Sequence, residues 1–577
     1  MSNFRLDEGG RIDRDRPVRF RFDGADLQGL AGDTLASALL ANGIHRVGTS
    51  IKHGRPRGIV AAGPEEPTAV VQVERPFPEP VLPAPTVELS EGLEATGLPG
   101  KGRLADEEDP AAYDAMHAHC DVLVVGGGPA GLAAARAAAR SGARVVLTDA
   151  DTELGGTLLG RREDLDGFPA QRWIDRTTAY LDRCEDVRIL RRTTVFGYYE
   201  DNYLVAVEHR GESASSRQRV WHLRAGEVVL ATGAHERPLV FAGNDRPGTM
   251  LAGAAQTYLH RYAVAAGSRA VVFTTNDSAY AAAVDLHDSG VEIAGVVDAR
   301  DVVPTYWASL CVERGIRVHP ATAVVSTSGI ERVSSAHLAS LPGDDAESHD
   351  VRKVLRCDLL LVSGGWNPAV HLHSQAGGSL RFAEALGAFV PDGSAQAVRS
   401  AGAAAGLFST AECLRSGEEA GQRAARSLEF EAGTGVLPRA RRTPVLAGRN
   451  LWVVPGPCDS AGTTKYVDLA RDCTVADIHR AVGAGLSSVE HIKRCTTLGT
   501  AHDQGKTSCV TAAGVIAEAL GGDLADLGTT TYRAPCTPVA SGALAGRDRG
   551  ELYDPVRVTA RPIPEGRPVS ESREVQP

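Results

Sequence analysis

Hydrophobic and polar positions follow one another in part of the chain in the order expected of a strand, a tight turn, a helix and a second strand. The apolar run Val122–Val125 leads into a G-x-G-x-x-G motif at 126–131, and the alanine-rich stretch 132–139 that follows contains no helix breaker. A second apolar run then ends in Asp149. This order predicts a βαβ unit with the glycine loop at the start of its helix.

The glycines and the acid of this unit suit a dinucleotide. Gly126 permits the tight turn, Gly128 lets a pyrophosphate approach the backbone, and Gly131 lets the helix pack closely on the strand. The helix N-terminus faces the phosphate charge. Asp149, 18 residues after Gly131, can accept hydrogen bonds from a ribose diol. We therefore predict a dinucleotide site here; the alternative is a βαβ unit that has kept the shape and lost the ligand.

Other glycine-rich strand ends extend this interpretation. Thr157, after two glycines, is placed to continue the nucleotide-binding wall, and Thr232-Gly233 ends a strand of the kind that closes the first nucleotide domain in two-nucleotide flavoproteins. A second βαβ pattern follows, but Thr274 to Asp277 replace its glycines, and their side chains would keep a pyrophosphate from the backbone. We predict that this second half kept its architecture without a second dinucleotide.

The N-terminal region predicts a β-grasp module with one helix. In ferredoxin-like modules of this type the iron–sulfur ligands stand in the loop after the helix, here Gly48–Gly58, and no cysteine precedes Cys120. Because a cluster needs those thiolates, we predict a structural or docking module and no iron–sulfur cluster. The basic residues of this loop are interpreted as solvated surface or as an anion contact; they are Lys52, His53, Arg55 and Arg57.

Pattern and breakers together predict an α/β multidomain fold. Residues 79–119 are rich in Pro, Gly and acidic residues, which is typical of a linker. Residues 406–429 predict a helix packed over the cofactor. The expected units are a module at 1–100, a first nucleotide domain at 118–234 and 356–430, a second at 235–355, a small helical domain at 440–555 and a disordered tail at 556–577.

Composition narrows the classes of partner. The 577 residues exceed what one core supports, and a net charge of -11 argues against nucleic acid or an acidic membrane as a partner. No apolar run reaches membrane-spanning length and the N-terminus is polar, so a cytoplasmic protein is expected. The ten cysteines include no C-x-C or C-x-x-C pair. This usage favours reduced thiols and predicts no metal site.

Long stretches of the chain resemble the alpha subunit of heterotetrameric sarcosine oxidase. They include GGRIDRDRP, GDTLASALLANG, ATGAHERPLVFAGNDRPGTM, VEHIKRCTTLGTAHDQGKTS and GTTTYRAPCTPVASGALAG. The resemblance implies a ferredoxin-like module, two-nucleotide-type FAD/NAD-linked Rossmann domains and a small helical domain. It ends where the family's folate-binding aminomethyltransferase-like domain is expected to begin.

The resemblance also implies cofactors. NAD is expected in the first site, with FAD as the alternative on this chain, while FAD and a covalent FMN belong chiefly to a beta-type subunit. The NAD contacts carried over by position are Ala130, Asp149, Ala150, Asp151, Thr157, Val195, Leu414 and Ser416. Related opine and proline dehydrogenase subunits carry a [2Fe–2S] cluster in the helical domain. The matching positions here are Asp468, Ala470, Asp503 and Ser508, none of them cysteine.

The implied activity is oxidative demethylation of sarcosine or a related N-methyl amino acid, yielding a glycine-type product, formaldehyde and hydrogen peroxide. Catalytic residues are expected on a partner chain, in a complex with smaller gamma- and delta-type subunits. Candidate FMN-phosphate ligands, chosen for charge and hydroxyl groups, are Lys493, Arg494, Thr496, Lys506 and Arg533, with solvated helix faces as the alternative. Two other functions stay open: an FAD-binding subunit of an oxygen-independent dehydrogenase, and a non-catalytic NAD-dependent scaffold.

Overall fold

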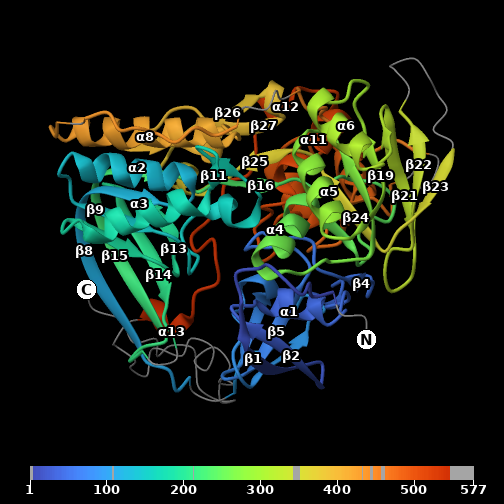
Figure 1. The fold of residues 1–577 in the computed structure, drawn as a ribbon. Helices are drawn as coiled ribbons and strands as arrows, with labels where there is room; N and C mark the ends of the chain where they lie inside the picture. The colour runs from blue at the N-terminus through green and yellow to red at the C-terminus, as the bar shows by residue number, and fades with distance from the viewer. Residues whose placement is uncertain are drawn as a thin grey trace, which may run out of the picture.

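A computed structural model describes residues 4–106, 109–211, 214–341, 351–431, 433–441, 446–456 and 462–545. The predicted disordered tail at 556–577 lies outside the described residues. Figure 1 shows the first nucleotide domain on the left, the second on the right and the N-terminal module below them. Together they confirm the predicted α/β multidomain class.

The N-terminal module is a β-grasp sheet packed on one buried helix, as predicted. The strand order is β2-β1-β7-β5-β6, with β1 and β7 parallel. The side chain of Thr34 caps α1 and every residue of that helix is buried. The elements are β1 (Asp13–Phe22), β2 (Ala25–Ala31), α1 (Leu35–Ala41), β3 (Gly48–Thr49), β4 (Pro56–Arg57), β5 (Val70–Arg75), β6 (Glu79–Pro83), a 3-10 helix (Ala84–Thr86) and β7 (Leu93–Gly97).

The predicted linker at 79–119 is wrong over its first part. Residues 79–97 supply β6 and β7, and β8 begins at Tyr113. Prolines are tolerated because β6 is an edge strand, where a missing N–H donor breaks no internal ladder. The proline-rich composition therefore marks a sheet edge as well as a connection.

The first nucleotide domain is built on a sheet of order β12-β9-β8-β15-β14-β13, with β28 beside β15. The run at the end of β8 is buried on both faces, since Val122 and Val124 pack under the helices while Leu123 and Val125 face a second core. Figure 1 shows α8 above α2 over this sheet. The elements are β8 (Tyr113–Val125), α2 (Pro129–Arg140), β9 (Val145–Thr148), a 3-10 helix (Gly156–Gly160), β10 (Asp164–Leu165), β11 (Phe168–Pro169), α3 (Gln171–Arg183), β12 (Val187–Leu190), β13 (Thr193–Tyr199), β14 (Tyr203–His209), β15 (Gln218–Leu230), β28 (Val398–Ser400), a 3-10 helix (Gly402–Ala405) and α8 (Thr410–Ser427).

The second nucleotide-type domain has the parallel strand order β17-β24-β18-β19-β20. Its core is continuous with that of the N-terminal module. The elements are β17 (Thr249–Leu251), α4 (Ala252–Tyr262), β18 (Arg269–Thr274), α5 (Ser278–Asp288), β19 (Glu292–Asp298), α6 (Thr305–Glu313), β20 (Val318–His319), a three-stranded sheet of β21 (Thr322–Ser328), β22 (Ser335–Ser340) and β23 (Lys353–Arg356), and then β24 (Leu359–Ser363).

The chain returns to the first domain later than predicted. The boundary expected at 355/356 assigned β24 to the first domain, but β24 pairs with β17 and β18 in the second sheet. A short apolar run fits the core of either parallel sheet, so its pattern does not identify its partners. Elements that follow are β25 (Trp366–Pro368), which pairs with β16 (Ala234–Glu236), α7 (His371–Gln375), β26 (Leu380–Ala383), a 3-10 helix (Glu384–Leu386) and β27 (Ala388–Pro391).

The small helical domain has its own core, and its last helix leaves it. α13 packs on β8 and β15 of the first nucleotide domain, where Tyr113 and Cys536 share a cluster. The predicted unit at 440–555 is thus divided. Its elements are β29 (Tyr466–Asp468), β30 (Cys473–Thr474), α9 (Val475–Gly483), α10 (Val489–Thr496), α11 (Cys509–Leu520), α12 (Leu524–Leu527) and α13 (Ser541–Ala545).

The basic loop of the N-terminal module joins three units. Arg55 pairs with Asp245 through two bonds of 2.5 and 2.9 Å, and the buried Arg57 pairs with both Asp245 and Asp472. Lys52 Nζ lies 3.2 Å from Thr497 Oγ1. The predicted solvated surface holds for the exposed Lys52 and His53, while Arg55 and Arg57 form an interdomain junction of ion pairs.

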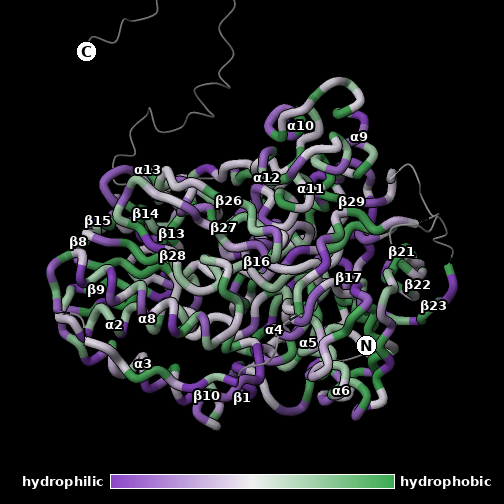
Figure 2. The backbone as a smooth tube through the Cα atoms, turned by 90° about the horizontal axis from the view of Figure 1, so that it is seen from above, coloured by the Kyte–Doolittle hydropathy of each residue, from purple (hydrophilic) through white to green (hydrophobic). Residues whose placement is uncertain are grey.

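The hydropathy of each segment agrees with its burial in the fold. In Figure 2 the peripheral helix α3 is mostly hydrophilic, and its buried side includes Trp173, Ile174 and Leu181. Among the residues that the structure describes, no helix combines the length and the apolar character needed to cross a membrane.

Candidate dinucleotide-binding site

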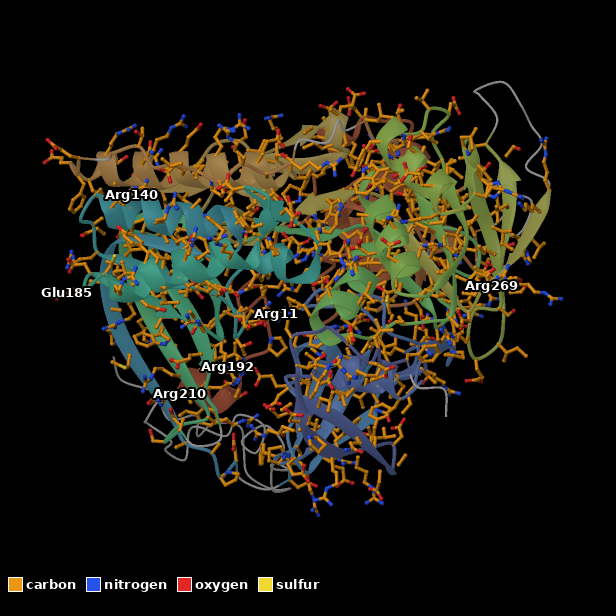
Figure 3. All side chains as sticks on the ribbon, in the orientation of Figure 1. Arg11, Arg140, Glu185, Arg192, Arg210 and Arg269 are labelled. Atoms are coloured by element: carbon orange, nitrogen blue, oxygen red, sulfur yellow. The ribbon has the colours of Figure 1, made fainter. Side chains whose placement is uncertain are left out.

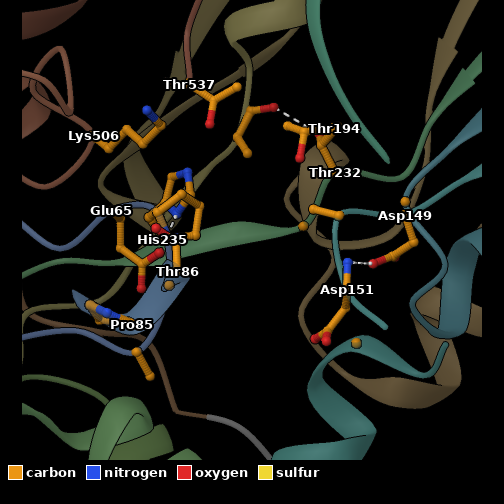
Figure 4. Close-up of a pocket in the computed structure, with 18 of the residues that line it drawn as sticks. Glu65, Pro85, Thr86, Asp149, Asp151, Thr194, Thr232, His235, Lys506 and Thr537 are labelled. Carbon is orange, nitrogen blue, oxygen red and sulfur yellow. Dashed lines mark hydrogen bonds and ion pairs between the residues drawn. The ribbon is translucent and has the colours of Figure 1, made fainter. Parts of the chain in front are cut away.

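A cleft of about 2700 Å³ opens where the N-terminal module, both nucleotide-type domains and the C-terminal segment meet. The glycine loop before α2 lies along it, as do parts of the second domain and residues 536–542. Figure 4 shows two sides of this cleft: Asp149, Asp151 and Thr232 on one, and Glu65, His235 and Lys506 on the other.

The glycine loop has the geometry that the sequence predicts. Gly126 has a φ of +101°, and a Cβ there would lie 2.3 Å from the carbonyl oxygen of Ala231. A Cβ on Gly131 would lie 1.7 Å from the carbonyl oxygen of Gly126. At Gly128, the N-cap of α2, the nearest atom to such a Cβ would be 3.9 Å away, so its open side faces the cleft. The loop thus leaves room for a pyrophosphate at the helix N-terminus.

Asp149 is held at the end of β9 by backbone donors. Its carboxylate accepts hydrogen bonds from Gly127 N and from Asp151 N, the latter at 2.7 Å. Burial raises the pKa of Asp149 to about 6, against these hydrogen bonds, which favour the charged form. The carboxylate therefore borders the glycine loop at the place where a ribose diol would lie.

Ion pairs frame this end of the cleft. Asp151 pairs with Arg261 of α4, with a second bond of 2.9 Å between Oδ1 and Nη2. Arg192 lies 3.0 Å from Glu88 of the N-terminal module. Figure 3 shows Arg192 on the first domain. Arg11 of the N-terminal module pairs with Glu153 of the first domain at 2.7 Å. The N-terminal module therefore forms a wall of the predicted nucleotide site.

The predicted contacts divide into two groups. Leu414 is buried in the core of the first domain, and Ser416 accepts a hydrogen bond from Gly402 N at 3.2 Å. Neither is among the residues that line the cleft, where the same helix presents Thr410 and Cys413, and the part assigned to Leu414 and Ser416 stays a prediction. The predicted residues that do line it are Gly126, Gly128, Ala130, Asp149, Ala150, Asp151, Thr157, Val195, Thr232 and Gly233.

The corresponding loop of the second βαβ unit also borders the cleft at Thr275–Ser278, but its polar groups bond to other parts of the chain. Asn276 Nδ2 donates to Ser363 Oγ at 3.0 Å, and Asp277 pairs with the buried Arg300 at 2.7 Å. A later segment lies across the loop: Leu446 N donates to Asp277 at 3.0 Å and Arg449 N donates to the Thr275 carbonyl at 2.9 Å. The groups that would meet a phosphate already have partners within the chain.

The five candidate FMN-phosphate ligands do not converge. Lys493 and Arg494 lie on α10 and do not line the cleft, and Arg533 is exposed. Thr496 Oγ1 donates to the Ile492 carbonyl at 2.7 Å. Only Lys506 among the five lies on the cleft, a position that the sequence pattern does not reveal because its neighbours come from distant segments.

The four positions matched to cluster ligands in related dehydrogenases lie around one loop of the helical domain. Asp468 accepts backbone bonds from Ala470 N at 2.9 Å and Gly499 N at 2.7 Å. Burial, with the Asp503 carboxylate nearby, raises the pKa of Asp468 to about 6. Within the described ranges, no three His, Cys, Asp or Glu side chains are grouped to hold a metal ion.

Three protein families match separate parts of the chain. Residues 120–386 match the pyridine nucleotide-disulphide oxidoreductase family, residues 15–98 the 2Fe-2S iron-sulfur cluster binding domain, and residues 462–547 the sarcosine oxidase A3 domain. The first match puts residues 120–386 in an oxidoreductase family.

Curated relatives extend over nearly the whole chain. It is 50% identical to the sarcosine oxidase subunit alpha of Corynebacterium sp. (strain P-1), over 95% of this chain and 58% of that protein. It is 39% identical to the same subunit of Rhizobium meliloti (strain 1021), over 96% of this chain and 60% of that protein. The chain thus spans about three-fifths of the length of these relatives.

A solved structure shares the fold. The L-proline dehydrogenase from P. horikoshii superposes with a TM-score of 0.72 at 22% identity, covering 94% of this chain and all of that one. At this identity the likeness concerns the fold alone.

The family match at 15–98 corrects one prediction. The missing cysteines led us to predict no iron–sulfur cluster, yet this module belongs to a family of 2Fe-2S cluster binding domains. The match overturns that prediction for this chain, because it points to a possible iron–sulfur cluster. Residues 15–98 hold no cysteine thiolate to ligate a cluster, so the stretch itself does not fit the group, and no step below uses one.

Proposed function

We propose that this chain, which belongs with the alpha subunits of sarcosine oxidases by its sequence, is the dinucleotide-binding subunit of a multi-subunit flavoenzyme that oxidises an N-methyl amino acid. The observation that carries the proposal is the open glycine loop at Gly128, beside Asp149, in a chain similar to sarcosine oxidase alpha subunits. The predicted resemblance to this subunit is confirmed by the identity over 95% of the chain.

The residues of the first site would bind and orient a dinucleotide. The N-terminus of α2 and the backbone at Gly128 would receive the pyrophosphate, and Asp149 would accept hydrogen bonds from the ribose. Because a carboxylate repels a 2′-phosphate, we infer NAD or FAD in this site and not NADP. A bound dinucleotide supplies hydride-transfer chemistry, while the protein supplies binding and orientation.

NAD is the form that we propose for this chain. The substrate class is sarcosine or a related N-methyl amino acid, with a glycine-type product, formaldehyde and hydrogen peroxide as products of the whole enzyme. Partner subunits of beta, gamma and delta type would complete the complex and carry the reacting flavin. A cytoplasmic location belongs to the same proposal and is supported by the cysteine usage of the sequence.

Cofactor analysis of the purified chain tests this proposal. The chain is denatured in acid, the released cofactor is identified by mass spectrometry, and iron is assayed in the same sample. NAD in a one-to-one ratio, without flavin, supports the proposed subunit. FAD in that ratio would place the redox step on this chain and favour the dehydrogenase alternative. Absence of any dinucleotide would contradict both the proposed subunit and this alternative.

The whole activity is tested by co-expression with the partner subunits. Sarcosine-dependent hydrogen peroxide release is expected from the complex and not from this chain alone. Amine-dependent reduction of an artificial acceptor without peroxide would contradict the oxidase assignment.

A further inference from the structure

The N-terminal module is fastened to the end of α4, next to the ribose end of the cleft. Arg5 Nη1 donates to the Tyr262 carbonyl at 2.6 Å. Arg11 N donates to the Arg261 carbonyl, also at 2.6 Å, and the Arg11 side chain pairs with Glu153 of the first domain at 2.7 Å. The module therefore joins both nucleotide-type domains at the position of Arg261.

Arg261 reaches from this junction to the loop after β9. Its guanidinium pairs with the Asp151 carboxylate, and Nη2 lies 2.9 Å from Oδ1. Asp151 N in turn donates to Asp149 Oδ1 at 2.7 Å. Burial raises the pKa of Asp149, and the charge of Arg261 acts against that rise. Arg261 is therefore within electrostatic reach of the acid that borders the expected ribose position.

A second arginine is bound to the same loop. Arg192 N donates to the Asp151 carbonyl at 2.9 Å, and the Arg192 guanidinium lies 3.0 Å from Glu88 of the N-terminal module. Burial raises the pKa of Glu88; Arg192 opposes this rise and the charge of Asp151 adds to it. Two acid–arginine pairs thus lie at one end of the cleft, which is lined by Glu88, Asp149, Asp151, Arg192 and Arg261.

Glu88 has a defined place at this end of the cleft. Its backbone forms an antiparallel bridge with Thr34, which is the N-cap of the buried helix α1. Figure 4 shows the neighbouring Pro85 and Thr86 across the cleft from Asp149. The module therefore presents this acid from a fixed part of its fold.

Both arginines of this cluster are already paired with acids. A 2′-phosphate on a ribose at Asp149 would bring strong negative charge, and sites that accept this group commonly use an arginine. Asp149 would repel the phosphate, and the two ion pairs withhold the cations that could compensate for this repulsion.

We propose that Glu88 and Asp151 are specificity-determining residues, which neutralise Arg192 and Arg261 and thereby exclude a dinucleotide that carries a 2′-phosphate. The N-terminal module then takes part in the choice of cofactor, through Glu88 and through its hold on the end of α4. This inference rests on the proposed dinucleotide function of the first site.

Calorimetric titration of the full chain, freed of bound dinucleotide, tests the inference. The probes are ADP, which is the part that NAD and FAD share, and ADP that carries a 2′-phosphate. Glu88→Gln and Asp151→Asn each remove a charge with little change of shape. Each should raise the affinity for the phosphorylated probe relative to ADP by about tenfold, because the freed arginine gains a charge-assisted bond. An unchanged ratio of the two affinities in either variant would overturn the inference.

Two further variants separate the ion pairs from a general change of charge. Glu91→Gln removes the same charge from the same module, but Glu91 pairs with Arg19 at 3.0 Å and does not line the cleft, so the ratio should stay as in the wild type. Arg192→Gln added to Glu88→Gln should abolish the gain. A gain that persists without Arg192, or that appears in Glu91→Gln, would overturn the inference.

The wild type provides a test that does not depend on the folding of variants. It should bind ADP more tightly than the phosphorylated probe, and equal affinities would overturn the inference. Failure of the wild type to bind ADP would contradict the proposed dinucleotide function as well. ADP binding without discrimination would contradict this inference alone.

Discussion

The two βαβ units of this chain share an architecture and differ at the loop between the first strand and the helix. In the first unit, Gly126, Gly128 and Gly131 keep side chains away from the backbone, and the loop is open to the cleft. In the second unit, the side chains of Asn276 and Asp277 bond to neighbouring groups, and residues 446–449 lie across the loop. The two units thus differ in the loop and not in the fold around it, and we propose that this difference decides which of them binds a dinucleotide.

The acids at the ends of the second strands differ in the same way. Asp149 borders the cleft and bonds only backbone N–H groups, which leaves oxygen lone pairs for a ribose. Asp298 is completely buried and accepts from Arg300 and from Tyr280, each at 2.8 Å. The same residue type at the same position in the two halves therefore borders the cleft in one and is buried in the protein core in the other.

Replacement of Gly128 should have the largest effect on this comparison. Gly128→Val places a side chain on the open face of the first loop without a close protein neighbour, so the protein should fold and lose dinucleotide affinity by about 100-fold or more. The matched change in the second loop, Asn276→Val, should leave affinity unchanged. Calorimetric titration with NAD measures both, and equal losses would contradict the assigned difference.

Removal of the ion pair in the second loop should reduce stability and not binding. Asp277→Ala leaves the buried Arg300 with Asp298 as its remaining acid and frees Leu446 N. We expect the free energy of unfolding to fall by about 2 kcal/mol, measured by urea denaturation, because a buried ion pair is broken. Dinucleotide binding at this loop, exposed by the change, would show instead that residues 446–449 block a competent site.

Asp149→Asn tests the acid of the first site. The amide keeps one acceptor oxygen but loses the charge that strengthens a ribose hydrogen bond, so dinucleotide affinity should fall by about tenfold. Asp298→Asn, the matched change in the second unit, should affect thermal stability and leave affinity unaltered. If the Asp149→Asn variant binds the dinucleotide as tightly as the wild type, Asp149 does not contribute to the site.

The pH dependence of binding should give the smallest effect. Since the pKa of Asp149 is about 6, the carboxylate gains a proton as the pH falls below 6, and affinity at pH 5.5 should be lower than at pH 7.5 by up to about fourfold. This decrease in affinity between pH 7.5 and pH 5.5 should be absent in the Asp149→Asn variant. Titrations at the two pH values, compared between the two proteins, provide the measurement.

The raised pKa of Asp149 affects folding stability in the opposite direction from binding affinity. The unfolded aspartate has a pKa of 3.8, so the folded chain holds more protons than the unfolded chain between about pH 4 and pH 6. Through this group, stability therefore rises as the pH falls through that window. Weaker binding at pH 5.5 should not be accompanied by unfolding that originates at Asp149.

Local patterns were sufficient to predict the geometry of the first glycine loop. The spacing of Gly126, Gly128 and Gly131 and the strand end at Asp149 depend on residues that are neighbours in sequence, and the structure has the geometry they require. The β-grasp module and the loss of glycines in the second unit follow from equally local signals. Periodicity and turn residues carry this information because they act within one element.

Features formed between distant segments could not be predicted in this way. The pairing of β24 with the second sheet, the wall contributed by Glu88 and the position of Lys506 on the cleft each join residues far apart in the chain. Leu414 and Ser416 were carried over from the family resemblance; in this structure Leu414 lies in the core and Ser416 bonds Gly402 N, and neither lines the cleft. A periodic pattern gives the buried face of a helix and does not give the partner that covers it.

A crystal structure of the chain with bound dinucleotide tests the central claim most directly. The account predicts one dinucleotide per chain, with its pyrophosphate at the N-terminus of α2 and its ribose at Asp149. Density at Thr274–Asp277, with residues 446–449 displaced, would contradict it and make the second unit the binding domain.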